Sequence, residues 1–137
     1  MISIVLDTNV LVSAIFNPNG VPAQILEWVL NGEIGIIIDN RILSEYTSVL
    51  ERPQFEFALP RTVAILDVIS RYGKNVEGKP LTQQLPDSSD EPFLEVALSA
   101  QADYIITGNL RHFPAEKREG IKVVSPREFR EKYVKDN

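Results

Sequence analysis

The chain has 137 residues, 44% of them hydrophobic and 24% charged, a balance that excludes a disordered or fibrous protein and indicates one domain over residues 1–137. Its net charge of −5 argues against a broad basic surface that binds nucleic acid, although an enzyme can also hold phosphates through bound metal ions. No apolar run reaches the ~18 residues of a transmembrane helix and no secretory signal is visible, so we expect a cytoplasmic protein without membrane contact.

Short apolar runs alternate with helical periodicity along the chain. In chain order, the pattern predicts a strand over 2–6, a helix from Val10, a helix over 22–30, a strand over 34–38, helices over 41–51 and 60–72, a short strand near 75–77, a helix that opens at 87–91 and runs to 102, strands over 104–107 and 123–124, and a C-terminal helix from Pro126. This alternation predicts an α/β fold, a three-layer α/β/α sandwich with a central parallel sheet.

One helix carries a specific expectation about its buried face. In the helix over 60–72, the apolar residues Val63, Ile65, Leu66 and Ile69 are expected to turn toward the core, and Gly73 to end the helix.

Three polar residues, Asp7, Thr8 and Asn9, end the first apolar strand just before the first helix. In α/β sheets, ligand sites form at the carboxyl ends of the strands. A carboxylate is costly to bury there unless a cation meets it. Asp7 is therefore the first candidate site residue, and other acidic residues are expected to converge on it.

Glu45 is the second candidate acid. It falls at the border of the apolar stripe of its helix, whereas Glu51 falls on the solvent side. Glu45 can therefore reach over the edge of the sheet. The ordinary alternative is a flanking residue that simply reaches water.

Asp90 is the third candidate acid, because it lies one turn before Phe93 and Leu94 on the inward face of its helix. The helix dipole alone favours an acid near a helix start, and residues 88–91 match a capping box. Neither effect explains why the acid faces inward. Asp87 is expected to cap or solvate the preceding loop.

Asn109 follows Gly108 at the carboxyl end of the strand over 104–107, where it offers a fourth oxygen ligand; by itself the pair is an ordinary turn. Three converging carboxylates would raise one another's pKa values and oppose folding unless a divalent cation binds. The chain has no cysteine, which leaves oxygen ligands or the single histidine, His112. Oxygen ligands suit Mg²⁺ or Mn²⁺, which activate water in phosphodiester hydrolysis.

The four candidate segments resemble the motifs of the PIN domain, the small ribonuclease domain of many prokaryotic toxin–antitoxin toxins. The matching segments are residues 5–11, Ser44-Glu45, residues 90–97 and residues 102–109. The resemblance covers roughly residues 1–126, in order and at suitable spacing. It implies a PIN-like fold and a Mg²⁺- or Mn²⁺-dependent endoribonuclease, commonly a homodimer and often inhibited by an antitoxin protein.

Carried over by position, the resemblance implies that Asp7, Glu45 and Asp90 are catalytic metal ligands. Thr8, Asn9 and Thr107 would support the site through hydrogen bonds.

One position departs from the family pattern. Asn109 stands where the family usually has a fourth Asp, which removes one negative charge and implies a weaker second metal site and lower activity. Arg111 and His112, just beyond it, and Arg41 at the start of the third helix are secondary candidates for contacts with the RNA phosphate or base. Their ordinary interpretation is that of exposed surface residues.

Three alternatives stay open. A degenerate PIN module would bind RNA or a protein partner without catalysis, and Asn109 is its support. A phosphatase of the haloacid dehalogenase type needs a second acid two residues after the first, where this chain has Asn9. A response-regulator receiver would use Asp39 after the second strand, but its partner pattern is poor.

Overall fold

A five-stranded parallel sheet forms the centre of the computed structural model, which describes residues 1–136. The strand order is β3-β2-β1-β4-β5, and every neighbouring pair is parallel. The strands are β1 (Ser3–Leu6), β2 (Gly35–Ile38), β3 (Lys74–Asn75), β4 (Tyr104–Ile106) and β5 (Val123–Val124). The central strand, β1, is therefore the first in the sequence, and the residues that follow it lie in the middle of the sheet's carboxyl edge.

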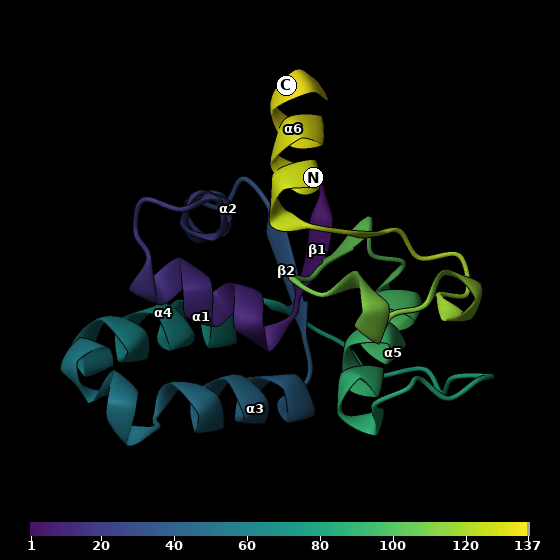
Figure 1. Cartoon of the computed structure of the whole chain (residues 1–137). Helices are drawn as coiled ribbons and strands as arrows, with labels where there is room; N and C mark the ends of the chain where they lie inside the picture. The colour runs from purple at the N-terminus through teal and green to yellow at the C-terminus, as the bar shows by residue number, and fades with distance from the viewer. Residues whose placement is uncertain (137) are drawn as a thin grey trace.

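Helices cover both faces of the sheet, which confirms the predicted three layers (Figure 1). On one side lie α1 (Thr8–Phe16), α2 (Val21–Leu30), α3 (Asn40–Leu50) and α4 (Leu59–Tyr72). On the other side α5 (Glu91–Ala100) packs against β1, β2 and β4. The C-terminal helix α6 (Pro126–Asp136) packs against α2. Short 3-10 turns occupy Pro53–Ala58, Ser88–Asp90, Leu110–His112 and Ala115–Lys117. Among the described residues, no helix is both long and apolar enough to cross a membrane.

The first strand is deeply buried in the core, as its apolar sequence predicts. Ile4, Val5 and Leu6 are each at most 1% exposed. Leu6 pairs with Ile106 of β4, and the backbone N–H of Asp7 donates to the carbonyl of Ile106 at 3.0 Å. This register places the end of β1 directly beside the end of β4.

One expectation about a helix is wrong, and one alternative weighed at a helix start does not form. Val63 was expected to face inward but is 57% exposed, because the buried stripe of α4 runs through Thr62, Ile65 and Ile69. Val63 lies two residues from Ile65, about 200° around the helix. The capping box at residues 88–91 is also absent: a 3-10 turn precedes α5, and Asp87 caps that turn by accepting from the backbone N–H of Ser89 at 2.9 Å.

Tyr46 anchors α3 to the carboxyl end of β1. Its side chain is fully buried, and its hydroxyl donates a hydrogen bond to the carbonyl oxygen of Leu6 at 2.5 Å. Burial, together with the negative charges of Asp7, Glu45 and Asp39, raises the pKa of Tyr46 well above its ordinary value. Tyr46 is therefore a neutral donor that fixes the neighbouring Glu45 relative to the end of β1.

Removing this hydroxyl should destabilise the fold measurably. We expect Tyr46→Phe to lower the free energy of unfolding by about 1–2 kcal/mol, because a buried carbonyl loses its donor. Urea denaturation measures the effect. Tyr72→Phe is the matched control, since Tyr72 is 80% exposed and its variant should unfold like the parent protein. Equal stability of the two variants would show that the Leu6 contact contributes nothing.

Candidate functional site

Asp7 lies at the carboxyl end of the central strand and is only 5% exposed. The hydroxyl of Thr107, which follows β4, donates a hydrogen bond to Asp7 Oδ2 at 2.7 Å. Asp7 is also the residue before α1, but its side chain makes no capping hydrogen bond to that helix. The carboxylate is thus held in one orientation by Thr107 while retaining lone pairs for another ligand.

Asp90 ends the 3-10 turn that leads into α5 and is 7% exposed, which confirms that it faces inward. Its Oδ2 atom is buried and has no hydrogen-bond partner among the described residues. Burial, with the charges of Asp7, Asp87 and Glu45, raises the pKa of Asp90 to about 6, and His112 opposes this rise. A buried acid with a raised pKa and an unpaired oxygen is typical of a functional site.

His112 completes a compact group with the two aspartates. Asp7, Asp90 and His112 each offer one potential ligand atom, and these atoms lie within 4.8 Å of one another. The Nδ1 atom of His112 is 3.5 Å from Asp90 Oδ2, and it too is buried without a hydrogen-bond partner among the described residues. Such a group has the size and donor set for one divalent cation.

Glu45 lies beside this group rather than within it. Its carboxylate accepts a hydrogen bond from the hydroxyl of Thr8, the first residue of α1. Its side chain is half-buried, as expected for the border of the apolar stripe, and Glu51 is exposed. Because its charge still acts on Asp90, Glu45 belongs to the same electrostatic site. Its predicted role as a metal ligand stays a prediction.

The other predicted residues in and just after the first and fourth motifs are exposed. Asn9 and Asn109 are exposed, as is Arg111. The backbone N–H of Asn109 donates to Thr107 Oγ1 at 3.1 Å, so Thr107 links this loop to Asp7. The ligand role of Asn109, the supporting role of Asn9 and the RNA contacts of Arg111 stay predictions.

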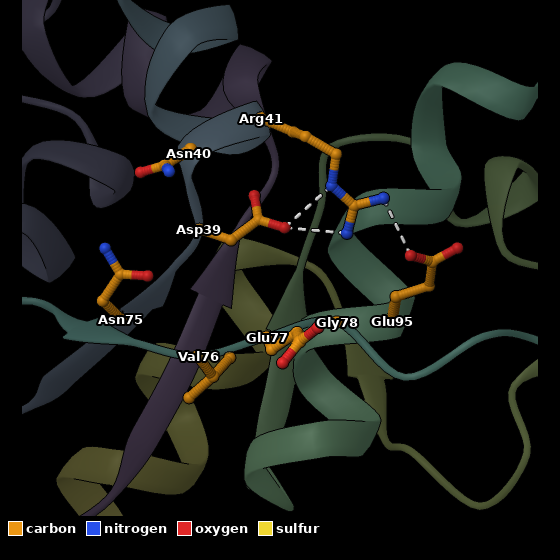
Figure 2. A pocket seen from close by; sticks show the side chains of 8 residues that line it. All are labelled: Asp39, Asn40, Arg41, Asn75, Val76, Glu77, Gly78 and Glu95. Carbon is orange, nitrogen blue, oxygen red and sulfur yellow. Dashed lines mark hydrogen bonds and ion pairs between the residues drawn. The ribbon is translucent and has the colours of Figure 1, made fainter.

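Arg41 faces a neighbouring pocket and is held by two carboxylates (Figure 2). It forms ion pairs with Asp39 Oδ2 at 2.7 Å and with Glu95 Oε1 at 2.8 Å, while Asp39 also caps α3 by accepting from Ile42 N–H. The pocket measures about 490 Å³ and is lined by Asp39, Asn40, Arg41, Asn75, Val76, Glu77, Gly78 and Glu95. Since its guanidinium is already neutralised, Arg41 retains little free charge for an RNA phosphate; its substrate role stays a prediction.

Sequence reasoning found the two aspartates but missed how closely His112 approaches them. The sequence leaves His112 open as a metal ligand, but its position just beyond Asn109 favours a substrate contact beside Arg111 and does not place it next to the aspartates. The sequence feature that could have indicated this is the segment from Asn109 to His112. Asparagine is a common N-cap, and in a 3-10 turn the residue three positions later lies on the same side as the cap. The structure has this turn, with Asn109 as its cap.

Comparisons with known proteins show the family to which the chain belongs. The uncharacterized protein MJ1680 of Methanocaldococcus jannaschii is 30% identical over 145 residues, covering 98% of this chain and 93% of that protein. The crystal structure of VapBC2 from Rickettsia felis, bound to a DNA fragment from their promoter, matches 90% of this chain and 98% of that chain, with a TM-score of 0.61 and 16% identity, and so supports the fold alone. The family model described as PIN domain matches residues 3–111. The chain therefore belongs to the PIN domain family.

Proposed function

We propose that the chain is a metal-dependent endoribonuclease that hydrolyses phosphodiester bonds in RNA. The observation that carries the proposal is the pair of buried carboxylates Asp7 and Asp90, which come from separate segments and have oxygens within 4.8 Å of each other. Two such charges repel each other and oppose folding, and a divalent cation would remove this cost. Membership of the PIN domain family supports the same chemistry, since these domains are generally ribonucleases.

The residues present fit Mg²⁺ or Mn²⁺. Asp90 Oδ2 is a buried acceptor without a partner among the described residues, and Asp7 keeps lone pairs after accepting one hydrogen bond from Thr107. These ions bind few protein carboxylates and retain several waters, so Glu45 would complete the site directly or through water. The amide oxygen of Asn109 accepts from the backbone N–H of Arg111, and its second lone pair makes it a further proposed ligand.

The chain's own residues would orient the reactants and move a proton. When bound, Mg²⁺ or Mn²⁺ supplies positive charge that lowers the pKa of water and stabilises the leaving oxygen. Thr107 holds the Asp7 carboxylate in one orientation through the 2.7 Å hydrogen bond. Glu45 or Asp90 would accept the proton of the water that attacks the phosphorus atom. The phosphorus–oxygen bond to the leaving group breaks, and the leaving oxygen takes up a proton from solvent.

Removal of the metal tests this proposal. We expect cleavage of single-stranded or structured RNA with Mg²⁺ or Mn²⁺, complete loss in EDTA and recovery when excess ion is restored, because the unpaired carboxylates need a cation to hold phosphate. Calorimetry with Mn²⁺ serves as the independent measurement. Cleavage that persists in EDTA would contradict the proposal, and an absence of binding at millimolar Mn²⁺ would favour a module that binds partners without catalysis.

The proposed biological setting is a cytoplasmic toxin–antitoxin pair. The likeness of the fold to a chain of the VapBC2 structure supports this setting, as does the resemblance of the motifs to those of PIN toxins. In that setting, a small antitoxin protein would bind the chain and suppress cleavage, and the toxin would be a homodimer. A neighbouring gene for a small DNA-binding protein, and its co-purification with this chain, would test the partner.

A further inference from the structure

Asp90 Oδ2 and His112 Nδ1 face each other across 3.5 Å, and neither atom has a hydrogen-bond partner among the described residues. Asp90 is more than nine-tenths buried, so water does not simply replace the missing partner. Whether His112 adds a nitrogen ligand to the cation or donates a proton to Asp90 depends on which ring nitrogen carries the hydrogen. The contacts on the other side of the ring determine which nitrogen carries the hydrogen.

Asn109 contacts the far nitrogen of the histidine ring. Its Oδ1 accepts a hydrogen bond from the backbone N–H of Arg111 at 3.1 Å. A backbone N–H can only donate, and this contact therefore fixes which end of the amide is oxygen. The Nδ2 group consequently points to His112 Nε2, at 3.1 Å. Because an amide NH₂ also can only donate, Nε2 must present its lone pair.

We infer that Asn109 holds neutral His112 in the tautomer with hydrogen on Nδ1, so that His112 donates toward Asp90 and stays outside the cation's ligand set. His112 is then a positioning residue that orients Asp90. The second half of this inference rests on the proposed function, since it concerns the cation that Asp7 and Asp90 would hold. The first half concerns only this chain's hydrogen bonds.

The polar groups then form one chain of donors with a single direction. The Arg111 N–H donates to Asn109, the Asn109 amide donates to Nε2, and Nδ1 lies 3.5 Å from the unpaired oxygen of Asp90. The separation of 3.5 Å is at the long limit for a hydrogen bond, so the last contact is mainly an electrostatic one. A nitrogen that carries hydrogen has no lone pair for a metal, and the cation is left with oxygen ligands.

Replacing Asn109 by aspartate should reverse the arrangement. One carboxylate oxygen would keep the Arg111 N–H, and the other would accept from His112 Nε2–H. The hydrogen would therefore leave Nδ1, whose lone pair would face the two aspartates. A metal-ligating histidine commonly has its other nitrogen bonded to a carboxylate in this way. Asn109→Asp is thus expected to convert His112 into a ligand.

The tautomer can be read directly by nuclear magnetic resonance, since His112 is the single histidine of the chain. In ¹⁵N-labelled, metal-free, tag-free protein at about pH 8, we expect the Nδ1–H pattern of long-range couplings in the wild type and the Nε2–H pattern in Asn109→Asp. Asn19→Asp, the same change in an exposed loop, should keep the wild-type pattern. An Nε2–H pattern in the wild type, or an unchanged pattern in Asn109→Asp, would overturn the inference.

Pulsed electron paramagnetic resonance with Mn²⁺ tests the ligand set. We expect no coupling to a directly bound nitrogen in the wild type and such a coupling in Asn109→Asp. A nitrogen coupling in the wild type would overturn the exclusion of His112. The resonance spectra of the ring need neither metal nor RNA, so a failure of the nuclease proposal and a failure of the tautomer assignment are distinguishable.

Discussion

Asp7→Asn is expected to lower the rate of RNA cleavage by at least about a hundredfold while leaving the fold intact. The loss follows from the weaker ligand: an amide carries no charge and has fewer lone pairs for a divalent cation. The fold should survive because the Asp7 side chain does not cap α1, and an amide oxygen can still accept the hydrogen bond from Thr107. The variant therefore separates the role of the charge from that of the packing.

Single-turnover cleavage of a labelled RNA at saturating Mn²⁺ gives the rate, and urea denaturation verifies folding. Glu51→Gln is the control, since it removes one acidic charge from the exposed side of α3, away from the acidic group. Its rate should equal that of the wild type. Wild-type cleavage by Asp7→Asn would show that RNA hydrolysis does not depend on this carboxylate, and the proposed function would then be wrong.

The positions of Asp7 and Asp90 were predictable because each follows from a local pattern. An apolar strand that ends in Asp7 places that residue at the carboxyl edge of a parallel sheet, and this placement depends only on the local sequence. The helical phase relative to Phe93 and Leu94 fixes Asp90 on the inward face, and both side chains are indeed buried. Helical phase also explains why the expectation for Val63 is wrong. Its apolar side chain suggests burial, but its angular position on α4 lies away from the buried stripe.

The arrangement around His112 was not predictable from periodicity. A 3-10 turn of three residues is too short to show a repeat, and it forms here because Asn109 caps it. The strand β3 was missed in its exact bounds for a similar reason. Its two residues are exposed and polar, and only pairing with β2 makes them a strand. Tertiary contacts, which the sequence does not display, determine both segments.

Asp90→Asn should make the metal-free protein more stable near neutral pH, by up to about 3 kcal/mol. The raised pKa of Asp90 means that the folded state disfavours the charged form, chiefly because the carboxylate is buried. An amide of nearly the same shape carries no charge and avoids this cost. The same substitution should abolish binding of the divalent cation, so one residue would contribute to function at the expense of stability.

The raised pKa of Asp90 should also make the free energy of unfolding of the wild type depend on pH, in a direction that can be derived. The pKa of Asp90 is about 6 in the folded protein and near its ordinary value of 3.8 in the unfolded chain. Between these values the folded state binds more protons at Asp90, so the contribution of Asp90 to the free energy of unfolding falls as the pH rises from about 4 to about 7 and is level beyond. Asp87, whose pKa is lowered by its hydrogen bonds to Ser89, acts in the opposite direction. The difference between the wild type and Asp90→Asn therefore isolates Asp90.

Urea denaturation of both proteins across this pH range, with and without Mn²⁺, tests whether the ionised Asp90 carboxylate destabilises the folded protein. At a Mn²⁺ concentration of a hundred times the dissociation constant, the free energy of unfolding of the wild type should rise by about 2.7 kcal/mol near pH 7.5. The rise should be smaller near pH 5, where protons compete with the ion for the carboxylates. Asp90→Asn should show no rise. Glu131→Gln, an exposed acid-to-amide change on α6, should follow the wild type throughout. If Asp90→Asn were less stable than the wild type without metal, the buried charge would already be satisfied by the protein. The electrostatic reason for a cation between Asp7 and Asp90 would then disappear.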